Sequence, residues 1–245
     1  PVECKRIRSE MPEVTVIELP ADSLGYERVL RACPIFERLS LSSEDQERGR
    51  YYAEERQRTA LQQNTNSLED FYRSLGQHVE IALATKEILA RVSQLTQKTN
   101  QFNLTTRRYN EQQILGFINN PECEVLTARA WDRFGDSGLI GVVITRDNGD
   151  ACEIDTCLMS CRVIGRGVET AMLAHVIAQA CSKDMKKVSG WFIPTQKNTP
   201  ARDFYQSHRF LKDAEQDGEI LWTLEIRRSK IACPDWIELN IKREG

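Results

Sequence analysis

Three strand-like segments follow one another directly in the second half of the chain, and they constrain the fold more than any other feature. They span 123–131, 138–146 and 151–160. The first two are joined by a turn over 136–138. The second turn, over 147–150, contains an Asn-Gly pair, the strongest short hairpin signal. The sequence therefore predicts an antiparallel meander, and helices packed on the faces of its sheet.

The segments on either side of this meander alternate between helix and strand patterns. Ser67 is placed to cap a short helix that ends at Gly76. The other expected elements are a strand over 79–84, a helix capped by Thr85, a helix capped by Thr105 or Thr106 and ending near 117–118, a helix over 167–182, a strand over 188–193, a helix over 200–208 and a last strand over 219–225. This order is typical of an α/β (α+β) fold with one mixed central sheet flanked by helices.

The first quarter of the chain has different patterns. Residues 4–10 look helical, 14–19 look like a strand, and 26–30 and 43–62 look helical again. The dense alternation of charges over 44–58 is typical of a solvated helix face. The predicted organisation is a remnant of a larger α/β domain over 1–25, a helical connector over 26–66 and the sheet-containing domain over 67–245. The chain begins at Pro1, and we expect it to be a fragment of something longer.

Composition excludes several classes of protein. Of the 245 residues, 28% are charged and 40% are apolar, which is ordinary for a globular chain. The net charge of −3 offers no basic footprint, so we expect no nucleic-acid partner. The longest strongly apolar run, 138–144, is far too short to cross a bilayer, and no signal peptide is visible. We expect a cytoplasmic protein with no membrane partner.

Eight cysteines raise the question of a metal site or of disulfides. No Cys-x-x-Cys pair occurs, and the closest grouping is Cys152, Cys157 and Cys161. Structural zinc sites usually have tightly spaced pairs. We therefore expect no metal and reduced thiols, most of them buried as small apolar residues.

The joint between the third meander strand and the following helix carries the clearest chemical signal. It reads SCRVIGRG over 160–167. Gly165 and Gly167 let backbone N–H groups turn toward one point, while Arg162 and Arg166 add positive charge at a helix N-terminus. Such a joint suits a phosphate or pyrophosphate group. A tight turn that needs glycine only for its backbone conformation is the structural alternative.

The pattern RxxGxG over 162–167 resembles the acyl-CoA-binding loop of the GNAT acyltransferase superfamily. A second matching stretch, NTPARDFY, runs from Asn198 to Tyr205 and is followed by Phe210. The resemblance covers 79–227. It implies a mixed sheet that splays open beside the second stretch and admits a pantetheine arm, with Tyr205 as general acid toward the departing thiolate. Asn198 is then a substrate-binding residue.

A closer resemblance is to the FkbH-like proteins of polyketide pathways, which join a phosphatase half of the haloacid-dehalogenase (HAD) type to a GNAT-like half. The matching segments are 94–106, 132–136 and 160–169. The resemblance implies that a glyceryl group from 1,3-bisphosphoglycerate is loaded as a thioester and passed to the phosphopantetheine thiol of an acyl carrier protein. The phosphatase half removes the remaining phosphate. The opening segment 1–8 resembles the stretch just after the last acidic motif of that half, and we expect 1–25 to be a remnant of it.

Two departures from these families are visible. The chain contains no DxDx(T/V) nucleophile motif, so the phosphatase chemistry, and the magnesium it uses, would belong to a part absent from this chain. We expect no bound cofactor, and the phosphopantetheine arm, or coenzyme A, enters as a substrate. Arg209 also stands where GNAT proteins commonly have glycine before Phe210, which affects the expected local turn.

Cys161 is the expected acyl-carrying nucleophile. A thiolate is favoured at a helix N-terminus beside Arg162 and Arg166, and an acyl phosphate needs little general-base help. Asp155, on the strand that leads into Cys161, is expected to orient the substrate or a base. A small residue chosen for packing is the alternative explanation of Cys161.

A polar stretch over 98–103 is expected to bind the hydroxyl and carbonyl groups of a glyceryl unit. Its amides Asn100, Gln101 and Asn103 can both donate and accept hydrogen bonds. Asp132 and Arg133 are expected near the substrate, with Arg133 as a phosphate ligand. The structural alternatives are loop-capping amides and a surface ion pair.

Two other functions stay open. The first is an acetyl-CoA-dependent GNAT N-acetyltransferase, which transfers directly to an amine without a covalent enzyme intermediate. The second is a module that only docks a carrier protein. Acetyl-CoA binding would favour the first, and carrier-protein binding without acyl exchange would favour the second.

Overall fold

The computed structural model describes residues 4, 6–7, 10, 16–33 and 43–242, without the side chains of 43–48 and 228. The chain divides into two compact units, Pro1–Arg50 and Tyr51–Gly245. The predicted boundaries at 25/26 and 66/67 stay predictions.

The described part of the first unit contains helices and, over 16–20, a segment without helix or strand. It contains η1 (Ser23–Gly25) and α2 (Tyr26–Arg31), and α3 (Ser43–Gln63) continues into the second unit. The helices expected over 26–30 and 43–62 are thus confirmed. Of the expected helix over 4–10, the described residues are helical and the others lie outside the description. The strand expected over 14–19 is not present at 16–19, and 14–15 lie outside the described residues.

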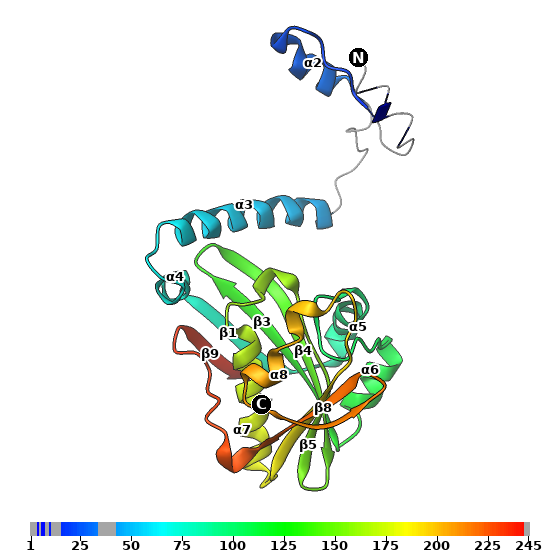
Figure 1. Ribbon diagram of the computed structural model, residues 1–245, viewed down its shortest axis with the longest axis vertical. Helices are drawn as coiled ribbons and strands as arrows, with labels where there is room; N and C mark the ends of the chain where they lie inside the picture. Colours follow the sequence, from blue (N-terminus) through cyan, green and yellow to red (C-terminus); the bar gives the residue numbers. More distant parts are fainter. Residues whose placement is uncertain (1–3, 5, 8–9, 11–15, 34–42, 243–245) are drawn as a thin grey trace. The chain divides into compact units, whose positions relative to one another are not determined.

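The second unit holds the sheet (Figure 1). Its helices are α4 (Leu68–Leu75), α5 (Leu89–Lys98), α6 (Glu111–Ile118), α7 (Val168–Ser182) and α8 (Phe204–Ser207), with short 3-10 turns η3 (Lys86–Ile88), η4 (Cys161–Val163), η5 (Thr199–Ala201) and η6 (Ile226–Arg228). Its strands are β1 (Gln77–Leu83), β2 (Phe102–Asn103), β3 (Cys123–Asp132), β4 (Gly135–Asn148), β5 (Ala151–Met159), β6 (Lys187–Phe192), β7 (Leu211–Gln216), β8 (Glu219–Glu225) and β9 (Ile237–Lys242).

These strands form one mixed sheet in the order β7-β8-β6-β5-β4-β3-β1-β9, with β2 paired to β5 off this path. The pairs β5–β6 and β1–β9 are parallel, and the others along the path are antiparallel. The expected mixed sheet flanked by helices is therefore confirmed, as is the meander at its centre.

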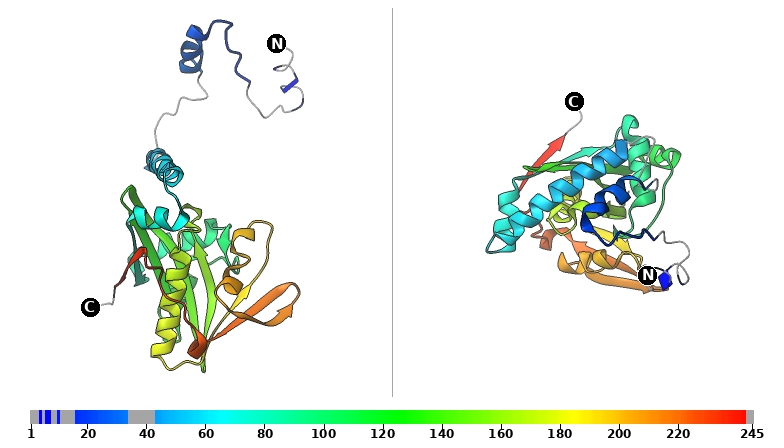
Figure 2. Two further views of the ribbon diagram at one scale, coloured as in Figure 1. Left: turned by 60° about the vertical axis from the view of Figure 1, so that its left-hand side comes forward. Right: turned by 90° about the horizontal axis from the view of Figure 1, so that it is seen from above.

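Helices cover both faces of the sheet (Figure 2). One core contains residues of α7 and α8, and the other contains residues of α5 and α6. Along β4, Val143 faces the first core, whereas Val142 and Ile144 face the second, as the period of two along a strand requires. In the described part of the chain, no helix combines the length and apolarity needed to span a membrane.

The first turn of the meander lies earlier than expected. The chain reverses at Arg133 and Phe134, because Asp132 Oδ1 accepts hydrogen bonds from the N–H groups of Phe134 (2.9 Å) and Gly135 (3.2 Å). Residues 136–138 belong instead to β4, where the register against β3 shifts. A side-chain turn of this kind is local chemistry that the sequence contained.

Other elements also differ from expectation. The helix assigned to a cap at Thr105 or Thr106 begins at Glu111, because Asn110 and Gln113 form a capping box. Thr85 precedes η3 rather than capping a helix through its side chain. The strands β2, β7 and β9 were not predicted, although the alternating residues of β9 and the Asp-Gly pair between β7 and β8 were readable signals.

Candidate active site

The joint between β5 and α7 has the backbone conformation that its glycines predict. Gly165 has φ +78° and Gly167 has φ +90°, both in the left-handed region that favours glycine. Gly167 is also a point of close approach, since a Cβ there would lie 3.0 Å from Pro234 Cγ. The conformation of this loop is thus set both by its own residues and by what packs against it.

Side chains from distant segments hold the carbonyl groups of this loop. The Tyr72 hydroxyl donates to the Gly165 carbonyl oxygen at 2.6 Å. The Arg166 carbonyl oxygen accepts from Trp236 Nε1 at 3.1 Å and from Gln77 Nε2 at 3.3 Å. Tyr72 and Trp236 also stack, with ring centroids 5.4 Å apart. The loop is therefore fixed by α4, β1 and the segment before β9.

A cavity of about 210 Å³ opens beside the loop, and Cys161 is on its wall with an exposed side chain. The other lining residues come from α3, from α4 and from the loop itself: Glu55, Arg58, Thr59, Gln62, Phe71, Tyr72, Arg162, Ile164, Gly165 and Arg166. Three arginines and a cysteine thus line one hollow of the second unit, and the Arg162 guanidinium lies over the Tyr51 ring, 3.9 Å from its centroid.

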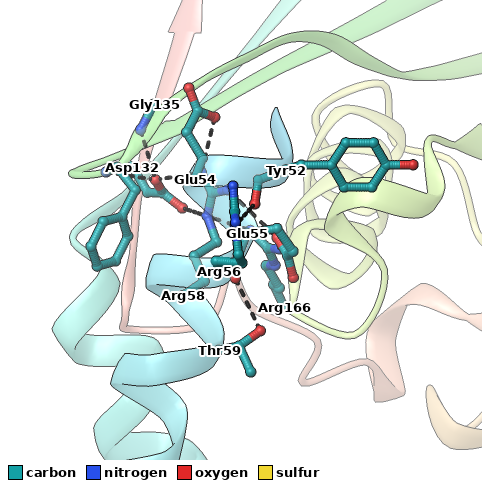
Figure 3. A network of polar contacts seen from close by, with 10 residues as sticks. Tyr52, Glu54, Glu55, Arg56, Arg58, Thr59, Asp132, Gly135 and Arg166 are labelled. Atoms are coloured by element: carbon teal, nitrogen blue, oxygen red, sulfur yellow. Dashed lines mark hydrogen bonds and ion pairs between the residues drawn. The ribbon is translucent and has the colours of Figure 1, made fainter. Parts of the chain in front are cut away.

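Two of these arginines belong to a buried ionic network (Figure 3). Arg58 makes two hydrogen bonds of 2.8 Å to the Asp132 carboxylate, and Arg166 Nη1 lies 3.6 Å from Asp132 Oδ2. The side chains of Arg58 and Asp132 are each 5% exposed. Glu55 Oε2 accepts from Arg166 Nη2 at 3.0 Å. Asp132 therefore positions both arginines at the cavity wall.

The pKa of Asp132 lies below its ordinary value. Burial alone would raise it, but the Arg58 hydrogen bonds, the Phe134 N–H group and the charges of Arg58 and Arg166 outweigh burial. Burial would lower the pKa of Arg58, but the hydrogen bonds and charge of Asp132, with the charges of Glu55 and Glu54, raise it. Both groups remain charged at neutral pH. The neighbouring Arg133 is exposed and has its guanidinium 4.8 Å from the Phe134 ring centroid, so its phosphate-binding role stays a prediction.

The thiols near the joint differ in exposure. Burial raises the pKa of Cys157 to about 12, and burial, with the charge of Asp147, does the same to Cys152. Both remain thiols at neutral pH and are poor nucleophiles. Cys161 and Cys181 are exposed, and of these two Cys161 lines the cavity. In the described part of the chain, no group of His, Cys, Asp or Glu side chains could hold a metal ion.

Strands β5 and β6 do separate at one end, but another segment of the chain lies between them. β5 pairs with β6 only from Ala151 to Ile154. Beyond that point β5 pairs with β2, and the Leu104 N–H donates to the Cys157 carbonyl at 3.0 Å. On the other side, the Ile193 N–H donates to the Leu104 carbonyl at 2.8 Å. The segment 102–105 thus occupies the place expected for a pantetheine arm.

Asn198 binds this segment through its side chain. Its Nδ2 donates to the carbonyls of Asn103 and Ile193, both at 2.9 Å. Its Oδ1 accepts from the Thr195 N–H at 2.7 Å and from the Thr195 hydroxyl at 3.0 Å. Asn198 is fully buried, as is Asn103. Every polar atom of the Asn198 side chain thus has a protein partner, and substrate binding by these two amides stays a prediction.

The remaining amides of the polar stretch lie nearer the surface. Asn100 Oδ1 accepts a 2.5 Å hydrogen bond from Arg108 Nη2. Gln101 is exposed. Arg108 also donates to the carbonyls of Thr96 and Thr99, so it ties the end of α5 to the segment before α6. Binding of a glyceryl group by Asn100 and Gln101 stays a prediction.

Asp155 is the centre of a second buried polar group. It accepts from Arg107 Nη1 at 2.6 Å and from the Tyr109 hydroxyl at 2.6 Å, and Arg146 Nη2 lies 3.2 Å away. Burial, followed by the hydrogen bond to Asp155, raises the pKa of Tyr109 to about 12. Asp155 does not line the cavity beside Cys161, so its expected role in orienting substrate stays a prediction.

Tyr205 is 1% exposed, and its hydroxyl has no hydrogen-bond partner. The hydroxyl packs on the backbone of β6, since a Cβ on Gly190 would lie 2.0 Å from it. Burial raises the pKa of Tyr205 well above its ordinary value. Its role as a general acid stays a prediction. Arg209, with φ +63°, adopts the left-handed conformation for which glycine was expected.

Glu169 lies beneath the loop at the first turn of α7. Burial raises the pKa of its carboxyl group, while its own backbone N–H and those of Gly165 and Gly167 act in the opposite direction. Its Oε2 is buried without a hydrogen-bond partner. The N–H groups expected to receive a phosphate therefore already act on a carboxyl of the chain.

Helices α3 and α4 contribute to the site, which the sequence did not predict. Glu55 and Arg58 lie in the stretch whose alternating charges predict a solvated helix face, yet Arg58 is buried and Glu55 contacts Arg166. Only the pairing of Arg58 with Asp132, 74 residues away in the sequence, reveals this. Tyr72 carried no signal beyond its place in the helix after Ser67.

Comparisons with known proteins give a likeness in fold. No protein-family model matches the chain, and no curated protein does. Among solved structures, PaiA N-acetyltransferase from Thermoplasma acidophilum in complex with coenzyme A is 14% identical, with a TM-score of 0.46 over 60% of this chain and 98% of that one. Ard1 from Thermoplasma volcanium is 14% identical, with a TM-score of 0.46 over 60% of this chain and 97% of that one.

A variant of the spermidine N-acetyltransferase SpeG from Vibrio cholerae is similar to the same degree. It is 12% identical, with a TM-score of 0.47 over 61% of this chain and 95% of that one. At such identities and scores, the argument for a function depends on the residues of this chain.

Proposed function

We propose that this protein is an acyltransferase in which Cys161 carries the acyl group as a thioester. The observation that carries the proposal is the position of Cys161, an exposed thiol on the wall of a cavity that also contains Arg58, Arg162 and Arg166. An accessible cysteine side chain on a cavity wall can form a covalent intermediate with an electrophilic carbon. A thiol and three guanidiniums suit a substrate with an electrophilic carbon and an anionic leaving group.

An acyl phosphate meets both requirements. The Cys161 thiolate attacks the carbonyl carbon, the bond from that carbon to the bridging oxygen breaks, and inorganic phosphate leaves. The guanidinium groups stabilise the phosphate oxygens as negative charge develops on the leaving group. In the second step an acceptor thiolate attacks the thioester carbonyl carbon, the C–S bond to Cys161 breaks, and the Cys161 thiolate is regenerated.

We propose 1,3-bisphosphoglycerate as the donor, a glyceryl unit as the acyl group and the phosphopantetheine thiol of an acyl carrier protein as the acceptor. The support is the resemblance of 94–106, 132–136 and 160–169 to FkbH-like proteins. Two of these segments contribute residues to the cavity or to the ion pairs at its wall. Asp132 holds Arg58 and Arg166, and the third segment supplies Cys161. Removal of the second phosphate belongs to a phosphatase partner or domain.

The position of 102–105 favours a thioester enzyme over direct transfer from acetyl-CoA. In the GNAT superfamily the pantetheine arm enters where the sheet splays, and here that place holds a segment with backbone hydrogen bonds to Cys157 and Ile193. An arm that reaches Cys161 from the cavity side needs no such opening. The acetyl-CoA-dependent N-acetyltransferase and the carrier-protein docking module are the two alternatives that the following test distinguishes.

The test is the intact mass of the 245-residue chain after mixing with glyceryl-loaded acyl carrier protein, which runs the second step backwards. We expect a mass increase of one glyceryl unit that maps to Cys161 and is absent in Cys161→Ala. Cys181→Ala is the matched control, because Cys181 is also exposed. Carrier-protein binding without a mass increase would contradict the thioester and favour the docking module. Binding of acetyl-CoA instead would favour the N-acetyltransferase.

A further inference from the structure

Glu55 occupies a position between two arginines at the wall of the cavity. Its Oε2 lies 3.0 Å from Arg166 Nη2 and 3.5 Å from Arg58 Nη1. The two guanidinium groups are largely buried, with side chains 11% and 5% exposed, whereas the Glu55 side chain is 55% exposed. The carboxylate can therefore turn into solvent without any backbone movement, while the arginines stay in place.

Arg58 and Arg166 stay in place when the Glu55 side chain turns away, because both also contact Asp132. Asp132 makes both hydrogen bonds to Arg58 and contacts Arg166. It is itself held by the N–H groups of Phe134 and Gly135. The two guanidiniums are thus held together by Asp132, and their other side contacts the half-exposed Glu55 carboxylate.

Among the described residues, Arg166 makes its ion pairs with Glu55 at 3.0 Å and with Asp132 at 3.6 Å. When Glu55 turns away, Arg166 keeps only the longer contact with Asp132, whose carboxylate also binds Arg58. A largely buried cation with a weakened counter-ion is costly, so the position attracts another anion.

We propose that Glu55 is a stand-in for the phosphate group of the substrate, and that Arg58 and Arg166 form the phosphate-binding site. An arriving phosphate displaces Glu55 and takes over its contacts with both guanidiniums. This inference deepens the proposed acyl transfer, because it assigns the leaving group a site and adds α3 to the active site.

Calorimetric titration of the Cys161→Ala chain with inorganic phosphate and with 3-phosphoglycerate tests the proposal. Neither probe contains an acyl phosphate, so binding is measured without acyl transfer. Glu55→Gln removes the competing charge and keeps the size of the side chain. An exposed ion pair of this kind contributes little, and we expect Glu55→Gln to bind both probes about two- to fivefold more tightly.

Glu69→Gln is the matched control. Glu69 pairs with Arg73 on α4 at 2.9 Å, has a side chain 63% exposed and does not line the cavity, so the affinity for both probes should not change. Unchanged or weaker binding in Glu55→Gln would overturn the inference, as would the absence of phosphate binding in both forms. Tighter binding in Glu55→Gln, together with no thioester on Cys161 in the mass experiment, would refute acyl transfer and leave the phosphate site standing.

Discussion

Replacement of Asn198 by alanine distinguishes a structural role from substrate binding. The side chain makes two hydrogen bonds as donor, to Asn103 and Ile193, and two as acceptor, both from Thr195. A hydrogen bond contributes about 0.5–1.5 kcal/mol net, and a buried partner left unsatisfied adds to the loss. We expect Asn198→Ala to lower the free energy of unfolding by about 3–4 kcal/mol.

The loss should be concentrated at the segment that Asn198 ties to the sheet. The N–H of Leu104 donates to Cys157 and the N–H of Ile193 donates to Leu104. Without Asn198, this segment can leave the gap between β5 and β6 more easily, so hydrogen exchange at these two amides should accelerate more than elsewhere in the sheet. Equilibrium urea unfolding measures the global loss, and hydrogen exchange followed by mass spectrometry locates it.

Asn119→Ala is the control, since Asn119 is an exposed amide at the end of α6 and surface changes usually stay within about 0.5 kcal/mol. A loss below about 1 kcal/mol in Asn198→Ala, with unchanged exchange at Leu104 and Ile193, would refute the structural role. A raised KM for glyceryl-loaded carrier protein at unchanged stability would instead establish Asn198 as a substrate-binding residue.

Three further predictions concern the site. Iodoacetamide at limiting dose should label Cys161 and leave Cys157, with its pKa near 12, unmodified in the folded protein; peptide mass mapping that finds Cys157 labelled first would contradict this. Asp132→Ala should cost about 3 kcal/mol at pH 7, because it leaves a buried guanidinium without its main partner. Because the pKa of Asp132 is lowered in the folded protein, its contribution to the free energy of unfolding is complete above its ordinary pKa near 4. The contribution is lost as the pH falls through the lowered pKa, so the denaturation curves of the unchanged chain and of Asp132→Ala should converge below pH 4. Tyr205→Phe should leave stability unchanged or raise it by about 1 kcal/mol, because the buried hydroxyl has no partner; a rate of acyl transfer reduced a hundredfold would instead show that Tyr205 acts as the general acid.

Local signals in the sequence were sufficient for several elements. Ser67 accepts a hydrogen bond from the Asp70 N–H, and Gly76 ends α4 with φ +57°. The turn with Gly149, at φ +63°, joins β4 to β5. These features depend on residues within a few positions of one another, so the sequence predicts them without knowledge of the rest of the fold.

The position of the site residues could be predicted only in part. The loop that begins at Cys161 was correctly placed between a strand and a helix, because strand and helix periodicities change there. The segment 98–103 was described as an irregular polar stretch, although its last two residues form a strand with β5. Two residues are too few to show a periodicity. The sequence therefore could not reveal that they lie in a gap of the sheet, beside a strand about 50 positions later in the chain.

The sequence by itself therefore determined the meander, the cap and the end of α4, and a glycine joint that contains a cysteine and two arginines. Only the tertiary structure decided which charges face that joint. Arg58 pairs with Asp132 across 74 residues, and Glu55 reaches Arg166 across 111. The physical reason is range: turns and caps depend on bonds between near neighbours, whereas a buried ion pair or a filled gap in a sheet depends on segments brought together by burial of the two cores.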